Sequence, residues 1–288
     1  MSGPDEELAE ALVLLTREHI EVEDWQVIRD LALKHGVLGL IYPNVESDEG
    51  KRALFPDYAR QASLSLAHLA ILSYLRDAGL EFLPMKGSSL IARGLYAPQE
   101  RPMLDIDLLV KPGDIQGFRS ILLSKGFLDV IASRKGFVMH RGKLSVDLHI
   151  YPLKPELYIP PKPLWARSVN GFLSPEDELI IISAHAALGS FTFGPRLIWQ
   201  EDAKRILRLA DPEKSLGLAR ALGLEGCVLR LLRAKSTDIV MAQRQPGRLR
   251  KLALAWGSGA NKGQRAMCIA MAFGDRIENL IRSIKGCV

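Results

Sequence analysis

Apolar residues near both ends of the chain recur with the period of an amphipathic helix. This period predicts helices over residues 6–20 and 24–40, and a long helix over residues 56–80 that follows a polar break and stops at Gly79. Beyond residue 160, Ser174 followed by Pro175 is typical of a helix start, with Ser174 as the N-cap. Further helices are predicted over residues 196–209, 216–222, 227–235 and 248–256.

Between residues 80 and 150 the pattern changes to short apolar runs separated by glycine and proline. We predict a small α+β core with a mixed sheet, flanked by helical segments on both sides. The expected regions are an N-terminal helical segment (1–55), the core (56–160) and a C-terminal helical domain (161–288). Within the core, helices are expected over residues 88–95 and 112–126, and strands over residues 80–85, 104–110, 127–132, 137–140 and 144–150.

Amino-acid composition indicates the class of protein and the cellular compartment in which we expect it. With 48% hydrophobic and 25% charged residues, the 288-residue chain resembles an ordinary globular protein. Three cysteines without C-x-x-C spacing argue for a reducing compartment and against a cysteine zinc site. The acidic start lacks a signal-peptide pattern, and no apolar run reaches about 18 residues, so we expect a cytoplasmic protein.

The net charge of +5 is unevenly distributed along the chain. Residues 226–288 hold 12 Lys/Arg and 3 Asp/Glu, a net of +9, whereas the preceding 225 residues hold 26 and 30, a net of −4. This asymmetry predicts a polyanionic partner or a phosphate-rich ligand. A solvated helical surface is the alternative.

Two carboxylates, Asp105 and Asp107, lie in the apolar run Leu104–Val110. At this spacing on a strand they point to the same face, where each raises the pKa of the other unless a cation lies between them. Oxygen ligands of this kind favour Mg²⁺ or Mn²⁺. In a structural alternative, Asp105 caps the turn after Pro102. Asp107 then pairs with Arg101 or a lysine.

Two further segments add to this pair. Lys86-Gly87-Ser88-Ser89 is a small turn before a predicted helix, where backbone N–H groups can receive phosphates. Ser145–His149 is a second strand with one more carboxylate, Asp147. His149 shares the strand face of Asp147 and can hydrogen-bond a carboxylate or phosphate, or serve only a structural role. Metal, phosphate and a third carboxylate together indicate phosphoryl or nucleotidyl transfer.

These elements, in this order, resemble the uncharacterised nucleotidyltransferase family of the DNA polymerase β-type nucleotidyltransferase superfamily. The resemblance is clear over residues 80–151 and weaker over residues 176–207. It rests on Lys-Gly with small residues, then R-x-x-x-D-I-D-L-L-V, then V-D-L-H. In one departure, Gly87 precedes Asp105 by 18 residues, where the wider superfamily places its glycine motif about a dozen residues before the carboxylates. The insertion at residues 96–100 absorbs the difference.

The resemblance implies a role for each motif. Asp105 and Asp107 would hold two Mg²⁺ (or Mn²⁺) ions that bridge the phosphates of an NTP substrate, of which ATP is one candidate. Asp147 would complete one metal site and help deprotonate the acceptor.

The same resemblance assigns the phosphate contacts. The N–H groups and hydroxyls of Ser88 and Ser89, after Gly87, would hold the β- and γ-phosphates. Lys86 and Arg101 are candidate phosphate clamps, and a surface charge or a salt bridge to the carboxylates is the alternative.

The predicted reaction transfers a nucleoside monophosphate from the NTP to an acceptor. The basic C-terminal quarter favours an RNA end, and a protein side chain or a small-molecule hydroxyl competes with it. A catalytically inactive nucleotide- or RNA-binding relative is the alternative function. The sequence lacks zinc-protease, α/β-hydrolase and P-loop motifs, and His185 is expected in the core or beside a ligand-binding residue. The cations predicted to line the acceptor cleft are Arg230, Arg233, Arg244, Arg248, Arg250 and Lys251.

Overall fold

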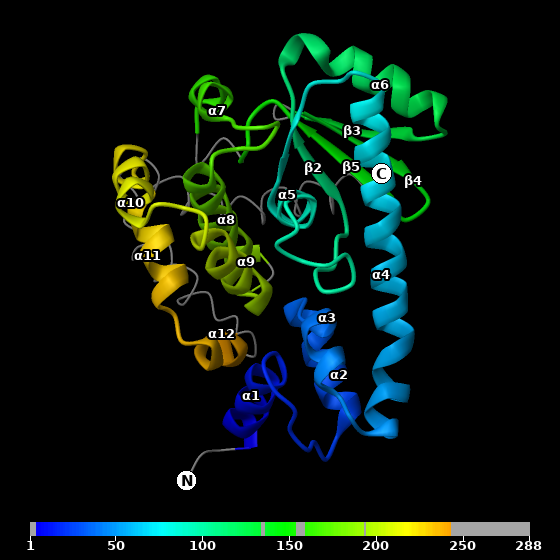
Figure 1. The fold of residues 1–288 in the computed structure, drawn as a ribbon, viewed down its shortest axis with the longest axis vertical. Coiled ribbons are helices and arrows are strands. Elements are labelled where there is room, and N and C mark those ends of the chain that lie inside the picture. Colours follow the sequence, from blue (N-terminus) through cyan, green and yellow to red (C-terminus); the bar gives the residue numbers. More distant parts are fainter. Residues whose placement is uncertain (1–3, 134–135, 154–158, 193, 243–288) are drawn as a thin grey trace, which may run out of the picture.

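The computed structural model describes residues 4–133, 136–153, 159–192 and 194–242 (Figure 1). It confirms the α+β fold, with a five-stranded mixed sheet flanked by helices. The strands are β1 (Leu83–Met85), β2 (Ile106–Leu109), β3 (Leu128–Ser133), β4 (Gly136–Arg141) and β5 (Leu144–His149).

The helices fall into three groups along the chain. Those before the sheet are α1 (Pro4–Leu15), α2 (Trp25–His35), α3 (Leu38–Ile41), η1 (Tyr42–Asn44) and α4 (Asp48–Asp77). Those between the strands are α5 (Lys86–Ala92), η2 (Pro112–Asp114) and α6 (Ile115–Ser124). Those after the sheet are α7 (Pro161–Arg167), α8 (Pro175–Thr192), α9 (Leu197–Leu207), α10 (Pro212–Ala221), α11 (Glu225–Arg233) and α12 (Ser236–Ala242).

The sheet has the strand order β1-β2-β5-β4-β3. Only β2 and β5 run parallel, and the register between them sets Asp107 opposite Asp147. The other neighbouring strands are antiparallel, and Met85 of β1 lies opposite Asp107. The sheet therefore brings the end of β1 and two carboxylates to one place.

The two faces of the sheet carry different residues because side chains alternate along each strand. Ile106, Leu108, Val146 and Leu148 belong to a buried cluster with residues of α4 and α6. Asp107 and Asp147 alternate with these residues and so face the other way, towards α5. One face is thus a hydrophobic core and the other carries the polar side chains.

The long helix α4 begins at Asp48, so the predicted break at residues 46–52 and the predicted start at Pro56 were wrong. Ser47 is its N-cap and accepts a hydrogen bond from the N–H of Gly50 at 3.1 Å. Pro56 lies inside the helix, where it removes one backbone hydrogen bond. The cap and the burial of Leu54 in the same turns offset that loss.

The predicted helix over residues 24–40 divides at Gly36, which takes a left-handed conformation with φ 71° and ends α2. At α8, the predicted N-cap is confirmed: the Ser174 hydroxyl accepts a hydrogen bond from the Asp177 N–H at 3.1 Å. The predicted helix over residues 248–256 lies outside the described residues.

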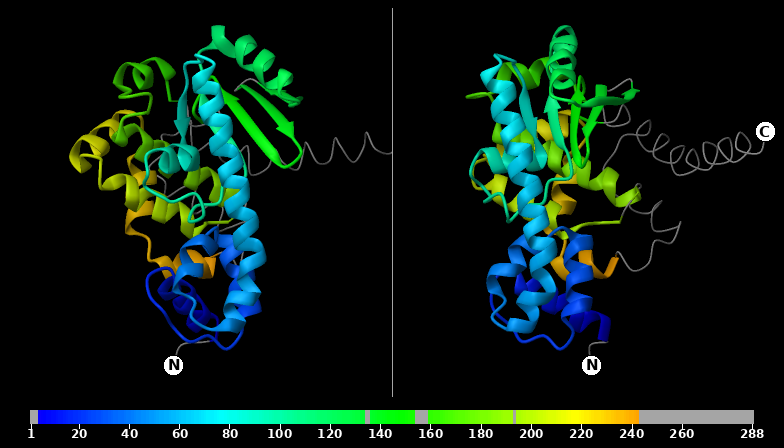
Figure 2. Two further views of the ribbon diagram at one scale, coloured as in Figure 1. Left: turned by 45° about the vertical axis from the view of Figure 1, so that its right-hand side comes forward. Right: turned by 90° about the vertical axis from the view of Figure 1, so that its right-hand side faces the viewer.

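Residues of the N-terminal and C-terminal helices share one buried hydrophobic cluster, which also includes Met85 and Leu109 from the sheet. Figures 1 and 2 show α12 next to the N-terminal helix α1. Helices from both ends of the described chain and the face of the sheet with Met85 and Leu109 therefore share one hydrophobic core. The division at residues 55/56 and 160/161 stays a prediction about folding units. Among the described helices, none is long and apolar enough to cross a membrane.

Candidate active site

Two of the three predicted carboxylates meet on adjacent parallel strands. Asp107 and Asp147 are register partners, and potential ligand atoms of Asp107, Asp147 and His149 all lie within 4.8 Å of one another. Asp105 immediately precedes β2, and its charge acts on Asp107 and on Lys86. The Asp147 carboxylate also accepts a hydrogen bond from the Ser145 hydroxyl at 3.4 Å.

Asp107 is the most heavily engaged of the three. Its Oδ1 lies 2.8 Å from Lys86 Nζ and 2.8 Å from His149 Nε2. Burial alone would raise the pKa of Asp107, but the neighbouring Lys86 charge and the His149 hydrogen bond hold that pKa well below its ordinary value. Asp107 is therefore ionised across the physiological pH range. The contact between His149 and Asp107 agrees with the prediction that His149 can hydrogen-bond a carboxylate.

Asp105 shows the opposite shift. The negative charge of Asp107, followed by burial, raises the pKa of Asp105 to about 7, although Lys86 opposes the shift. Its side chain reaches the pocket described below and remains accessible there. The Lys86 ammonium thus faces three carboxylates, Asp105, Asp107 and Asp147. Such an environment favours an additional cation.

Lys86 is held in a conformation that is rare outside glycine, with φ 55°. Its backbone N–H donates a hydrogen bond to Glu178 Oε1 of α8 at 2.6 Å. Burial raises the pKa of Glu178 to about 7, against the opposing effect of hydrogen bonds from Ser89 and Lys86. The C-terminal helices therefore help to fix the backbone from which the Lys86 ammonium reaches Asp107. Glu178 lies 92 residues from Lys86, within the segment of weaker family resemblance, and no motif indicated this contact.

The two serines of the predicted phosphate turn are buried. The Ser88 hydroxyl donates to the Met85 carbonyl at 2.7 Å, and the Ser89 hydroxyl accepts from Arg93 Nε at 3.2 Å. Neither serine lines the pocket, whereas Gly87 does. The side chains of this turn are thus engaged inside the protein, and its surface towards the pocket is formed by Lys86 and Gly87.

Arg101 pairs with Asp202 of α9, and not with Asp105 or Asp107 as the structural alternative supposed. Its Nε and Nη2 lie 3.0 Å and 2.8 Å from the two oxygens of Asp202. Both side chains are almost fully buried. The Arg101 guanidinium also packs on Gly87, where an added Cβ would lie 3.1 Å from Arg101 Cζ. Sequence analysis missed Asp202 because it is 101 residues away from its partner.

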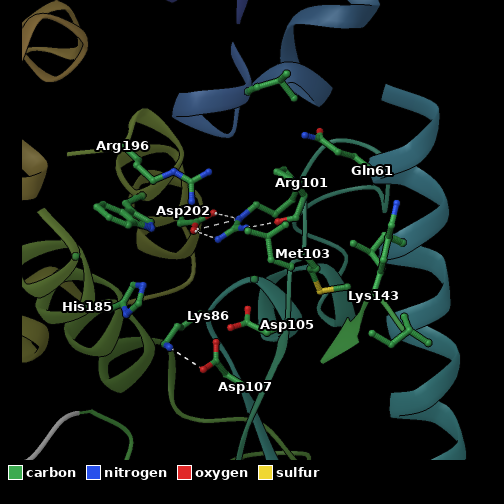
Figure 3. Close-up of a pocket in the computed structure, with 18 of the residues that line it drawn as sticks. Gln61, Lys86, Arg101, Met103, Asp105, Asp107, Lys143, His185, Arg196 and Asp202 are labelled. Carbon is green, nitrogen blue, oxygen red and sulfur yellow. Dashed lines mark hydrogen bonds and ion pairs between the residues drawn. The ribbon is translucent and has the colours of Figure 1, made fainter. Parts of the chain in front are cut away.

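Six of these residues form the floor of a pocket of about 1040 Å³ (Figure 3): Lys86, Gly87, Arg101, Asp105, Asp107 and Asp202. Asp147 and His149 are not among its lining residues. Its walls come from helices α2 and α4, from α8 and α9, and from the turn between β4 and β5. His185, which was expected in the core or beside a ligand-binding residue, lines this pocket and contacts the Trp199 ring edge-on. Burial and the charge of Lys86 lower the pKa of His185 to about 3, so its imidazole is neutral. Lys143, Arg196 and Trp199 are further pocket residues without a sequence motif.

The donor set suits a hard divalent cation. Asp107 and Asp147 offer carboxylate oxygens and His149 a ring nitrogen within one small volume, with Asp105 at its edge. The raised pKa of Asp105 indicates that the carboxylates are incompletely neutralised by Lys86. The residues present therefore fit a metal of the Mg²⁺ or Mn²⁺ type.

A small mixed sheet with carboxylates on two parallel strands, beside a lysine turn and a pocket, is the arrangement of a nucleotidyltransferase. The family model described as uncharacterised nucleotidyltransferase matches residues 21–237. The chain belongs to this family, and it is a transferase of nucleotidyl groups.

Among solved structures, the chain is similar to the solution structure of the antibiotic-resistance factor ANT(2'')-Ia. The two are 18% identical over 56% of this chain and 91% of that chain, with a TM-score of 0.42. A likeness this distant supports no statement about the chemistry of this chain. No curated protein matches.

The basic C-terminal quarter lies mostly outside the described residues, as do Arg244, Arg248, Arg250 and Lys251. Arg230 and Arg233 lie on α11, which packs on α8, α9 and α10. Neither of these two is among the residues that line the pocket.

Proposed function

We propose that the protein transfers a nucleoside monophosphate from an NTP to an acceptor hydroxyl with the help of Mg²⁺ or Mn²⁺. The observation that supports this most directly is the convergence of Asp107 and Asp147 on adjacent parallel strands, with Lys86 and Asp105 beside them. Asp105, Asp107 and Asp147 would hold the metal, with His149 orienting Asp107. When bound, the metal would neutralise the NTP phosphates and lower the pKa of the acceptor hydroxyl.

The reaction forms a bond between the acceptor oxygen and the α-phosphorus. The bond between the α-phosphorus and the oxygen that bridges to the β-phosphorus breaks, and pyrophosphate leaves with that electron pair. The acceptor proton passes to a carboxylate, for which Asp147 is our candidate. Lys86, Gly87 and Arg101, which line the pocket, are the proposed contacts to the phosphates. Ser88 and Ser89 are buried behind this turn, and their proposed role is to shape it.

For the acceptor we propose an RNA end. This rests on the net charge of +9 in residues 226–288, which can hold phosphates of the RNA that lie away from the transfer site. A cytoplasmic location fits this proposal. A protein side chain and a small-molecule hydroxyl are the competing acceptors.

The test uses the full chain with labelled NTPs, Mg²⁺ and total RNA, and follows both the transferred label and pyrophosphate. We expect label on RNA, loss of transfer with EDTA, and recovery with Mg²⁺ or Mn²⁺. Asp107→Asn is the inactive control, and Asp129→Asn, an exposed position on β3, is its matched counterpart. NTP binding without release of pyrophosphate in the presence of every acceptor class would instead support an inactive nucleotide-binding relative.

A further inference from the structure

The charges that line the pocket are unevenly balanced between its floor and its walls. On the floor, Asp107 contacts Lys86, and Asp202 contacts Arg101. The remaining charged residues that line the walls are all cations: Arg60, Lys143 and Arg196. Figure 3 shows Arg196 and Lys143 on opposite sides of the pocket, above the carboxylates.

Arg196 is the best defined of these cations. It directly precedes α9, and its Nε donates to the Lys34 carbonyl at the end of α2 at 3.1 Å. Its guanidinium carbon lies 5.9 Å from the centre of the Trp199 ring. An added Cβ at Gly36 would lie 2.7 Å from Arg196 Nη2, so the glycine that ends α2 also leaves room for this side chain.

This packing fixes the guanidinium without an ion-pair partner. Within the described part of the chain, no carboxylate forms an ion pair with Arg196, and burial followed by the charge of Arg101 lowers its pKa, although the charges of Asp202 and Asp105 oppose this shift. A half-buried guanidinium without an ion-pair partner is costly unless an anion binds to it. The arrangement is that of a ligand-binding arginine.

The other two cations increase the positive charge of the same walls. Lys143 lies on the exposed turn between β4 and β5 and has no ion-pair partner among the described residues. Arg60 pairs with the buried carboxylate of Asp57, which also pairs with Arg29, and Arg29 lies 3.6 Å from Asp30, so this group of four is neutral overall. An acceptor that enters between these walls therefore meets two cations without an ion-pair partner and one that is already paired.

We propose that Arg196, with Lys143 and Arg60, forms an acceptor subsite that binds a phosphate group carried by the acceptor itself. This proposal rests on the proposed function, because it assumes that the NTP phosphates occupy the carboxylate end of the pocket. The acceptor then supplies the attacking hydroxyl to the α-phosphorus while its own phosphate is held by Arg196. Pyrophosphate leaves as described above, and the acceptor phosphate remains unchanged.

The chemistry excludes one acceptor class and admits two. A cationic amino sugar would be repelled by the cations of the walls. Of the lining acids, Asp107 and Asp202 are already paired, and Asp105 lies at the carboxylate end, where the NTP and its metal are proposed to bind. A phosphorylated small molecule and the phosphodiester next to an RNA terminus both provide the required oxyanion. Arginine suits either source because its planar donors bind phosphate oxygens in pairs.

The test measures binding to protein that is already saturated with Mg²⁺ and a non-hydrolysable NTP analogue, so that the NTP phosphate positions are filled. Calorimetry compares glycerol phosphate, glycerol, a short oligoribonucleotide and a cationic amino sugar. We expect at least one of the two phosphate-bearing probes to bind at least about tenfold more tightly than glycerol. Which of the two binds identifies the source of the phosphate. Equal affinity for all four probes overturns the proposal.

Variants connect this binding to the named residues. Arg196→Gln and Lys143→Gln should each weaken phosphate binding about tenfold, while Arg52→Gln, an exposed arginine of α4 away from the pocket, should leave it unchanged. Affinity for the NTP analogue should stay within about twofold of wild type in all three. Unchanged phosphate affinity in both pocket variants overturns the proposal. A loss of NTP-analogue affinity in Arg196→Gln also overturns it, since Arg196 would then bind the NTP phosphates.

The design separates this proposal from the proposed function. If wild-type protein does not bind the NTP analogue, the proposed function fails, and the same phosphate titration on nucleotide-free protein still tests Arg196. Lys143→Gln keeps the test informative if Arg196→Gln is unstable, because Lys143 is exposed on a turn.

Discussion

The floor and the walls of the pocket use charge in different ways. On the floor, two buried ion pairs are matched, Lys86 with Asp107 and Arg101 with Asp202, and the exposed carboxylate of Asp105 lies beside them. On the walls, Arg196 and Lys143 have no ion-pair partner within the described residues. These matched buried pairs hold α5 to β2 and the loop before β2 to α9, because breaking either pair leaves an uncompensated buried charge. Unmatched cations near solvent contribute little to the fold and remain available for a ligand.

The largest expected effect is the loss of nucleotidyl transfer when a carboxylate on the floor of the pocket is replaced. Asp107→Asn should lower nucleotidyl transfer about a thousandfold, because it removes the carboxylate that both Lys86 and His149 contact. Initial rates of pyrophosphate release provide the measurement, and Arg52→Gln is the control. A variant that retains a tenth of wild-type activity would show that Asp107 is structural.

The next effect compares the paired Arg101 with Arg196, which has no ion-pair partner among the described residues, by the free energy of unfolding. Asp202→Asn should reduce the free energy of unfolding by about 3–5 kcal/mol, because it leaves Arg101 buried without its partner. Arg196→Gln should cost less than about 1 kcal/mol, since it removes one exposed hydrogen bond to Lys34. Urea unfolding measures both. Equal losses would mean that the two arginines have the same structural role.

A pH effect distinguishes the two acids beside the lysine turn, the exposed Asp105 and the buried Glu178. The pKa values of Asp105 and Glu178 are both raised to about 7, so each binds a proton in the folded protein before it does so in the unfolded chain. Their contribution to stability is therefore present at acidic pH and declines as pH rises from about 4 to about 7.

Without Mg²⁺, Glu178→Gln should reduce this decline by up to about 3 kcal/mol. Asp105→Asn should reduce it by less, because the Asp105 side chain is exposed and solvent screens its charge. With saturating Mg²⁺, the part due to Asp105 should disappear, while the part due to Glu178 persists because that acid contacts the Lys86 backbone and not the metal site. Melting temperatures across this pH range test the prediction. A decline that Mg²⁺ leaves unchanged in wild type would argue against metal binding at Asp105.

The smallest effect concerns the turn that joins floor and walls. Gly87→Ala should weaken binding of an NTP about threefold, because its Cβ would press on the Arg101 guanidinium at 3.1 Å. Gly217→Ala in α10 is the matched control, since its Cβ meets nothing within 4 Å. That control should leave NTP binding unchanged and stabilise its helix by up to about 1 kcal/mol. Equal NTP affinity in Gly87→Ala and wild type would separate the turn from nucleotide binding.

The sequence by itself determined the α+β class, the five strands and the pairing of a D-x-D strand with a second carboxylate strand. Alternation of apolar and polar residues is local information, so it put Asp105 and Asp107 on one strand and Asp147 on another. The resemblance to a family implied that these strands share a site, and the structure sets Asp107 opposite Asp147. It placed the start of α4 wrongly, because Pro56 is a strong local breaker whose cost is offset by a cap and by packing that lie elsewhere in the sequence.

The tertiary structure alone decided what surrounds those carboxylates. Glu178 reaches Lys86 across 92 residues, Asp202 reaches Arg101 across 101, and Arg196 reaches Lys34 across 162. No periodicity or motif links such pairs, because each depends on how the helices after the sheet pack against α2 and the lysine turn. The local pattern thus determines which residues are proposed for the reaction, and long-range packing determines which charges are matched and which have no partner within the described residues.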